Sequence, residues 1–359
     1  MKRVAFFMSF LLLGCFTCLW AHDFVVTGTN GQKLYFKITD ARRQYVEVTY
    51  QGSITSVQPS AYSGEVTIPA KVKHNDKVYQ VTGVSRKAFS NAGELTGIIL
   101  PSGLSSIGDF AFEGCTKLQK IVFPGNVVRF GEGVFFRCPS ISQVTLGSDW
   151  TSVNLKMFRW SDQLVSITIP AKLTSLQNLK SLKGLKTIEV DANNPNFASV
   201  DGLLYNKSKT VLLGCPRAFA GVVKVAEGTT AVYWGALADC TGITSVDLPA
   251  SLESLSFREF ARLEQLTTIV MRGEKPLMTA KSGGKEVFLL KVANPLQIAL
   301  QVPKPAQKEY KNTLCSEEGE YTEIPGNIPE GVSPEYAVIP LQVKAGELLT
   351  KKQVKGKKF

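Results

Sequence analysis

Apolar residues recur at one fixed distance along the middle of the chain. Phe89, Phe112, Phe135 and Phe158 lie 23 residues apart. Three further columns keep the same step. They are a Leu or Ile (Leu95, Leu118, Ile141, Leu164), an Ile or Val three residues later (Ile98, Ile121, Val144, Ile167) and a Pro or Gly (Pro101, Pro124, Gly147, Pro170). Four columns with one period identify a repeat protein.

Each repeat reads L-x-x-I-x-[IL]-P, then a variable stretch, then A-F-x-x-C-x-x-L. In the first part alternate residues face opposite sides, which predicts a short β-strand that the Pro ends. Such a unit cannot bury its apolar side alone, so neighbouring coils must stack, with their strands in one parallel sheet. One strand and one A-F turn per coil fit a leucine-rich horseshoe better than a parallel β-helix with three strands per coil. We therefore predict an α/β-type repeat solenoid, a right-handed horseshoe with short helical or 3-10 turns.

The repeats cover residues 66–272, with expanded copies at 70–84 and 191–226. The polar stretch 73–77 predicts a hairpin in the first, and 199–213 predicts two strands around 206–209 in the second. Residues 22–65 alternate apolar and polar, which predicts a β-hairpin N-terminal cap. A degenerate last repeat and C-terminal cap follow at 273–314, and 315–359 form an irregular, basic, partly disordered tail.

The first 21 residues have the pattern of an export signal. Lys2 and Arg3 precede an apolar run that ends at Ala21. This order predicts a secretory signal peptide over residues 1–21, cleaved after Ala21. Two alternatives remain open: lipid attachment at Cys15, which follows Leu12-Leu13-Gly14, and an uncleaved anchor. All three place the protein outside the cytoplasm, in the medium, at the cell surface or in the periplasm.

The repeat resembles the BspA-like, or Treponema pallidum-type, leucine-rich repeat. The segment Ala111-Phe112-Glu-Gly-Cys115-Thr-Lys-Leu118-Gln-Lys-Ile121-Val-Phe123-Pro124 carries its motif. Two accessory segments, 194–205 and 302–311, also resemble parts of that family. The resemblance implies a secreted or surface-exposed bacterial protein, typical of Bacteroidetes and oral spirochaetes, that adheres to host matrix proteins, other bacteria or glycans. It implies no catalytic motif.

Charge and composition limit the kinds of partner and site that we expect. The net charge of +11 includes Lys2 and Arg3, and residues 344–359 add six Lys and one Glu. The basicity therefore does not belong to the folded repeats, and nucleic acid is not an expected partner. Only two His are present, His22 and His74. A nucleophilic site needs a nearby base, usually His, so we predict no enzyme, no metal site and no cofactor.

Cysteines occupy one column of the repeat. Cys115, Cys138 and Cys240 each stand three residues before the Leu or Ile position. A free Cys behaves as a small buried hydrophobe, so we interpret the column as structural. A disulfide between Cys115 and Cys138 is the alternative, because like positions of adjacent coils lie near 5 Å apart, within disulfide range.

The exposed side of the sheet is the candidate ligand-binding face, because residues flanking the buried Ile point outward. The predicted site comprises Ile99, Lys120, Val122, Gln143, Thr145, Ser166, Thr168, Thr187, Glu189, Ser245 and Asp247. This ribbon is small, hydroxylated or neutral for the most part, with no aromatic row and no basic stripe. We expect Trp150, Trp160 and Trp234 to pack inside the coils.

The sequence thus predicts an exported, non-catalytic binding or adhesion module for protein or glycan ligands, with a membrane partner only through a lipid at Cys15. Two alternatives stay open. One is a carbohydrate-active enzyme on a repeat scaffold. The other is a periplasmic scaffold that binds envelope polymers through its basic tail.

Overall fold

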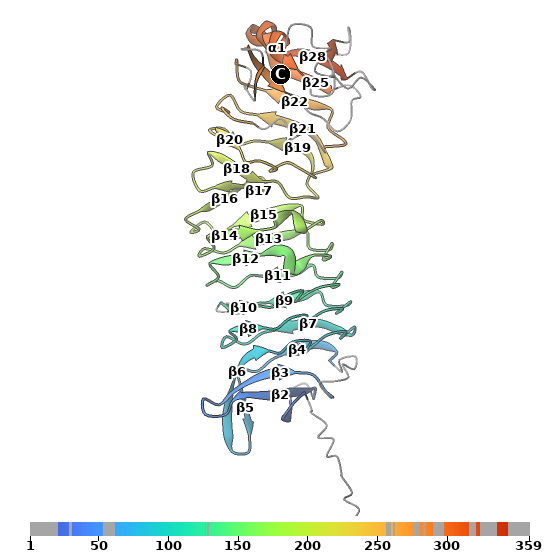
Figure 1. Cartoon of the computed structure of the whole chain (residues 1–359), viewed down its shortest axis with the longest axis vertical. Coiled ribbons are helices and arrows are strands. Elements are labelled where there is room, and N and C mark those ends of the chain that lie inside the picture. The colour runs from blue at the N-terminus through green and yellow to red at the C-terminus, as the bar shows by residue number, and fades with distance from the viewer. Residues whose placement is uncertain are drawn as a thin grey trace, which may run out of the picture.

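The protein is an elongated stack of coils (Figure 1). The structure, a computed structural model, describes most of the chain between residues 21 and 343. The described residues are 21–28, 31–52, 62–125, 127, 129–255, 260, 263–275, 277, 280–282, 285–289, 298–315, 321–323 and 336–343. The predicted signal segment 1–20 with Cys15, and the basic end 344–359, lie outside these residues.

Parallel strands follow one another along one side of the stack in three hydrogen-bonded groups, here together called the repeat sheet. It contains β4 (Gly64–Thr67), β7 (Leu95–Ile99), β9 (Lys120–Val122), β11 (Gln143–Thr145), β13 (Ser166–Ile169), β15 (Thr187–Val190), β19 (Ala220–Lys224), β21 (Gly242–Leu248), β22 (Thr268–Met271) and β25 (Ile298–Pro303). The sequence step sets the register: Lys120 pairs with Gln143, and Ser245 with Thr268. About eight turns of this parallel solenoid confirm the predicted repeat fold.

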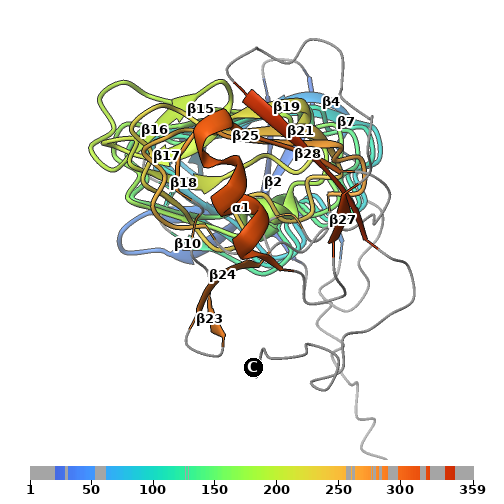
Figure 2. The same ribbon diagram turned by 90° about the horizontal axis from the view of Figure 1, so that it is seen from above.

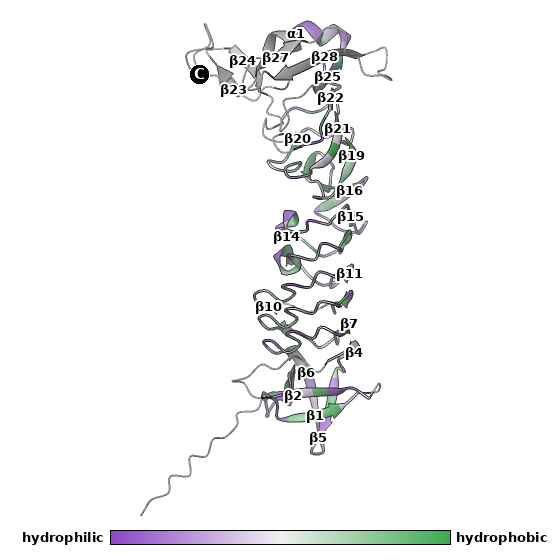
Figure 3. Ribbon diagram, turned by 90° about the vertical axis from the view of Figure 1, so that its right-hand side faces the viewer, coloured by the Kyte–Doolittle hydropathy of each residue, from purple (hydrophilic) through white to green (hydrophobic). Residues whose placement is uncertain are grey.

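A second row of short strands lies on the other side of the coils, here called the opposite sheet (Figure 3). It contains β6 (Lys77–Val84), β8 (Ser106–Ile107), β10 (Arg129–Phe130), β12 (Ser152–Asn154), β14 (Ser175–Gln177), β18 (Val211–Gly214) and β20 (Ala231–Val232). The expectation of a single strand per coil is therefore wrong. The apolar residue of the variable stretch, such as Ile107 or Val153, is buried and anchors two or three paired residues.

The Phe column forms a continuous stack of rings inside the coils. Centroids of Phe89, Phe112, Phe135 and Phe158 follow one another at 4.8, 5.1 and 5.3 Å, with interplanar angles of 11°, 13° and 12°. All four rings are fully buried. Tyr62 extends the stack at its lower end, 4.4 Å from Phe89. The 23-residue period thus places an aromatic ring at the height of each coil.

The N-terminal end is closed by antiparallel strands. β1 (Phe24–Thr27), β2 (Lys33–Asp40) and β3 (Tyr45–Thr49) pair in order, and β3 then pairs in parallel with β6 of the first coil. The polar stretch after residue 70 forms the hairpin of β5 (Lys71–His74) and β6. Its turn residues Asn75 and Asp76 both have positive φ, as a two-residue hairpin turn requires.

A three-stranded insert divides the core into two clusters. β16 (Phe197–Val200) and β17 (Leu203–Asn206) form a hairpin, and β17 pairs on with β18. Leu204 packs into the N-terminal core, whereas its neighbours Leu203 and Tyr205 pack into the C-terminal core. Asn194 precedes the insert, fully buried. It donates to the carbonyls of Pro170 and Leu173 and accepts from the amides of residues 196 and 197.

The C-terminal end combines a short helix with added strands. α1 (Gln307–Thr313) follows the 3-10 turn η4 (Lys304–Ala306) and lies across the end of the stack (Figure 2). Besides η1 (Leu155–Phe158) and η2 (Leu179–Ser181), the remaining elements are β23 (Ala280–Ser282), β24 (Lys285–Leu289), β26 (Leu314–Cys315), β27 (Tyr321–Glu323) and β28 (Tyr336–Val343). β28 pairs antiparallel with β25, so this part of the expected irregular tail is instead a strand of the repeat sheet. Among the described residues, no helix has the length and apolarity to cross a membrane.

Candidate functional site

The structure places the predicted binding residues in two regular columns on the repeat sheet. Lys120 pairs with Gln143, and Val122 with Thr145, so each column continues from coil to coil. The same holds for Thr168 with Glu189 two coils further on. The exposed members are Lys120, Gln143, Thr145, Thr168 and Glu189, whereas Ile99, Val122, Ser166, Thr187, Ser245 and Asp247 are half-buried.

Asp247 differs from the other predicted residues because its carboxylate already has a partner. Arg272 donates from Nε and Nη2 to the two carboxylate oxygens, each at 2.7 Å. This two-pronged geometry is the strong form of an arginine–carboxylate pair. Asp247 therefore presents a neutralised ion pair to a ligand, where the sequence suggested a free acid.

Sequence reasoning missed two exposed members of the same face. Val222 and Lys224 on β19 pair with Ser245 and Asp247 and stand in the two columns. The insert before β19 shifts the local period, so the 23-residue step does not reach them. The alternation in Val222-Val-Lys-Val-Ala226, with Val223 and Val225 buried, was the available signal.

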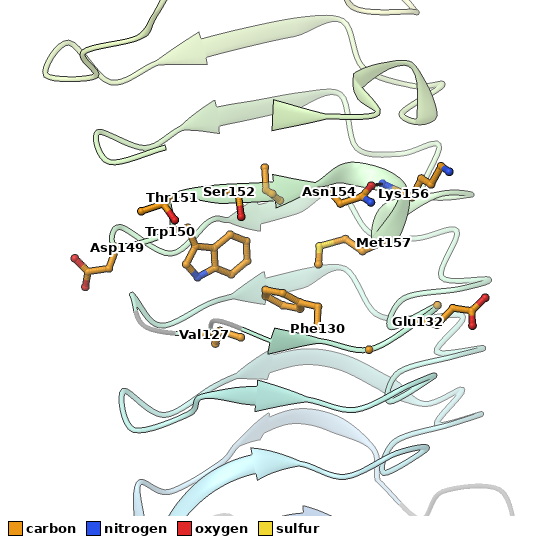
Figure 4. A pocket seen from close by; sticks show the side chains of 13 residues that line it. Val127, Phe130, Glu132, Asp149, Trp150, Thr151, Ser152, Asn154, Lys156 and Met157 are labelled. Carbon is orange, nitrogen blue, oxygen red and sulfur yellow. Dashed lines mark hydrogen bonds between the residues drawn. The ribbon is translucent and has the colours of Figure 1, made fainter. Parts of the chain in front are cut away.

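A pocket of about 480 Å³ opens on the opposite sheet, between β10 and β12 (Figure 4). The 23-residue step would pair Phe130 with Val153, but among the described residues β10 pairs with β8 alone and β12 with β14 alone. Figure 4 shows the side chains of Phe130, Trp150 and Met157 in the gap between the two strands. The rings of Phe130 and Trp150 meet edge to face at 4.9 Å.

The pocket exists because one coil departs from the consensus. Where the two flanking coils carry Pro124 and Pro170, this coil carries Gly147, and a Cβ there would overlap Trp150 Nε1 and the carbonyl oxygen of Pro124. The indole is 3% exposed, and its Nε1–H is buried without a hydrogen-bond partner. The bulky indole of Trp150 therefore occupies the space in which β10 and β12 would otherwise pair.

The rim of the pocket is polar but does not bring two carboxylates together. Figure 4 shows Asp149 and Glu132 at opposite ends of the opening. Asp149 forms an ion pair with Lys172 of the next coil. Hydrolysis of a glycoside needs two carboxyl groups flanking one bond, so this rim does not supply that chemistry.

The three tryptophans have different environments. Trp150 is buried as expected, but Trp160 and Trp234 are 41% and 68% exposed, so the expectation that they pack inside the coils is wrong. Lys183 lies 4.7 Å above the Trp160 ring, which is covered by cations rather than by core residues. Trp234 stands beside the exposed Tyr233, just after β20.

The cysteine column is structural in its main part. The thiols of Cys115 and Cys138 are free and fully buried, and they donate to the carbonyls of Phe89 and Phe112 in the preceding coil, at 3.1 and 2.9 Å. The alternative of a disulfide between them is therefore not the state of this structure. In the described part of the chain, no three His, Cys, Asp or Glu side chains converge as metal ligands.

A stack of short parallel strands with an A-F turn and a Cys–carbonyl ladder defines a leucine-rich-repeat solenoid. A sequence profile described as "BspA type Leucine rich repeat region" matches residues 82–200 and 216–282 in six copies. The chain belongs to this BspA-type leucine-rich repeat family. No protein with curated annotation matches the chain.

Solved structures of bacterial leucine-rich repeat proteins are similar to this chain. The pneumococcal vaccine antigen PcpA is 19% identical, with a TM-score of 0.46 over 70% of this chain and 76% of its own. A leucine-rich repeat protein from Bacteroides ovatus is 20% identical, with a TM-score of 0.42 over 69% and 71%. The Treponema pallidum leucine-rich repeat protein is 18% identical, with a TM-score of 0.39 over 65% and 87%.

Proposed function

We propose that the chain is an exported, non-catalytic binding or adhesion module that contacts a protein ligand through the repeat sheet. The observation that carries this proposal is the pair of columns on that sheet. Lys120, Gln143, Thr145, Thr168 and Glu189 stay exposed at the same two positions of successive coils. Leucine-rich repeat proteins in general bind other proteins, which supports the same reading.

The chemistry of the face favours a protein over a glycan or a nucleic acid. Sugars stack on aromatic rings, and the predicted columns contain none. Phosphate backbones need clustered Lys and Arg, whereas the exposed predicted residues of this face include one Lys, Lys120, and one Glu, Glu189. Short polar side chains on a rigid sheet provide adaptable hydrogen bonds of the kind found at protein interfaces. A glycan ligand would instead use the exposed pair Tyr233 and Trp234.

The enzymatic alternative has less support. The carboxylates at the rim of the pocket lie at opposite ends of the opening, and His74 stacks on Phe24 at 4.2 Å in the N-terminal cap. The scaffold alternative depends on the basic residues 344–359, which lie outside the described residues.

Binding to immobilised extracellular-matrix proteins and to a glycan array tests the proposal. Thr145→Arg with Thr168→Arg adds bulk and charge to the repeat sheet, and we expect affinity to fall about tenfold or more, as for disruption of an interface centre. Gln177→Arg with Ser102→Arg makes the same change at exposed positions outside that sheet and serves as the matched control. An equal loss in the control, or a loss only on Trp234→Ala or on removal of residues 344–359, would overturn the proposal.

The proposed location is outside the cytoplasm, either released or held at the surface. A structural neighbour from Faecalibacterium prausnitzii is described as a leucine rich cell surface protein. Mass spectrometry of the mature N-terminus distinguishes cleavage after Ala21 from lipid attachment at Cys15. A mature protein that retains the unmodified residues 1–21 would contradict both forms of processing.

A further inference from the structure

A lysine reaches into the core at the coil that lacks the A-F turn. Lys180 lies in η2, and its Nζ donates to the carbonyls of Cys215 and Ala236 at 2.9 and 3.0 Å and contacts Cys240 Sγ at 3.1 Å. An ammonium has three N–H donors, so all three are used. The partners come from two later turns of the chain, brought together by the stacking of the coils.

The two cysteines of this cluster are neighbours in space. Cys215 follows β18, and Cys240 occupies the cysteine column of the next coil; both are fully buried and free. A side-chain hydrogen bond links the two thiols. Cys240 Sγ also lies 3.3 Å from the carbonyl oxygen of Pro216.

The cluster makes the two thiols unequal. The hydrogen bond from Cys215 and the Lys180 ammonium together lower the pKa of Cys240 to about 7, although burial opposes them. The same hydrogen bond and burial raise the pKa of Cys215. The Lys180 ammonium, 3.1 Å from Cys240 Sγ, therefore favours the thiolate at Cys240 over the thiolate at Cys215.

Cys115 and Cys138 form a matched pair elsewhere in the stack. Both are fully buried in adjacent coils, and each donates its proton to a backbone carbonyl. The neighbouring Cys138 thiol and burial raise the pKa of Cys115. Among the contacts of the described residues, no lysine reaches either thiol. The chain thus contains the same thiol pair with and without a buried cation.

We propose that Cys240 is an oxidation site for small peroxides and that Cys215 resolves the product to a disulfide. In the first step the Cys240 thiolate attacks one peroxide oxygen and the O–O bond breaks. Sulfur is oxidised to a sulfenic acid, and the hydroxide released takes a proton from solvent to give water. In the second step Cys215 sulfur attacks Cys240 sulfur and the S–O bond breaks. The leaving hydroxide takes the Cys215 proton, so a disulfide and a second water form.

Burial selects the oxidant. Cys240 is fully buried, whereas Lys180, whose Nζ contacts its sulfur, is half-buried. Because the sulfur is enclosed, we expect a molecule of the size of hydrogen peroxide to reach it more readily than a bulky disulfide. The adjacent thiol of Cys215 protects the sulfenic acid from further oxidation, because the disulfide closes within the cluster.

Peroxide oxidation of the purified, fully reduced protein tests the proposal. The reaction is quenched with N-ethylmaleimide under denaturing conditions, and thiols and cross-links are mapped by peptide mass spectrometry. We expect a Cys215–Cys240 disulfide that forms about tenfold faster or more than Cys115 or Cys138 oxidises in the same molecule, in proportion to thiolate content. The rate should rise with pH through a midpoint at about 7 and level off roughly one to two pH units higher, where Cys240 is fully thiolate. This comparison needs no variant, so folding is not in question.

Two substitutions assign the roles within the cluster. Lys180→Met should slow Cys240 oxidation about tenfold, while Lys186→Met, at an exposed position of the same coil, should leave the rate unchanged. In Cys215→Ser the sulfenic acid on Cys240 should persist and be trapped by dimedone. Equal oxidation of the two cysteine pairs, or an unchanged rate in a Lys180→Met protein with native circular dichroism, would overturn the proposal.

Discussion

The stack of Phe rings provides a quantitative test of what holds the coils together. Phe112 has a ring stacked on each face, Phe89 at 4.8 Å and Phe135 at 5.1 Å. Phe112→Leu keeps an apolar side chain in the core but removes both stacking contacts. An aromatic pair contributes about 0.5–1.5 kcal/mol beyond its buried area, so the loss should be about 1–3 kcal/mol. Phe112→Ala adds a cavity and should cost about 3–5 kcal/mol.

Urea unfolding followed by far-UV circular dichroism measures both losses. Phe158 lies at the end of the stack and has one parallel neighbour, Phe135 at 5.3 Å. Phe158→Leu is therefore the matched control, with about half the stacking loss of Phe112→Leu. The m-value should stay unchanged, because the same surface unfolds. If Phe112→Leu costs less than ~0.5 kcal/mol, or no more than Phe158→Leu, burial alone and not ring stacking stabilises the column.

Three further predictions concern single positions. Asn194→Ala removes the four hydrogen bonds of a fully buried side chain and should cost about 2–4 kcal/mol by urea unfolding. An unchanged midpoint would show that the insert does not depend on this side chain. In Gly184→Ala the new Cβ would overlap the carbonyl oxygen of Asp162 in the preceding coil, so the melting temperature should fall sharply. In Gly93→Ala the new Cβ would make only an ordinary van der Waals contact, so the melting temperature should change little. Equal shifts in the two variants would contradict this packing. Burial raises the pKa of the Tyr62 hydroxyl in the folded cap above its ordinary value of about 10, so the stability that the neutral hydroxyl contributes is complete below about pH 10 and is lost as the pH rises further. Tyr62→Phe should therefore reduce the loss of stability between pH 8 and pH 11 in urea unfolding. An identical loss in both proteins would refute the assignment.

The repeated parts of the structure are predictable from the sequence because each coil meets the same environment. A ring at the height of every coil requires Phe at every step, so the column Phe89 to Phe158 reports the stacking directly. The two outward columns follow from the same alternation. The strand at Ser106–Ile107 is not predictable in this way, since two paired residues are too short to form a pattern.

The pocket and the cysteine cluster could not be predicted from the sequence, for a different reason. Trp150 wedges two coils apart only because Gly147 leaves room for the indole, and that pairing is specific to one copy. Lys180 and Cys240 lie 60 residues apart, joined by an insert whose length breaks the period. Neither site has a repeated signal, so each depends on contacts that only the folded chain reveals.

The pocket and the cysteine cluster both occur where the regular pattern of the coils is interrupted. In a regular coil the amides and carbonyls of one turn pair with those of the next, and the side chains only fill the interior. Between β10 and β12 the ladder is missing, and a pocket takes its place. At η2 the A-F turn is missing, and the Lys180 ammonium donates to the carbonyls of Cys215 and Ala236, the second of which also accepts the backbone N–H of Cys215. At this coil a charged side chain therefore enters the core alongside the backbone pairing. We propose that the outward columns of the repeat sheet present the surface for a partner and that the irregular coil at η2 also holds the reactive thiols.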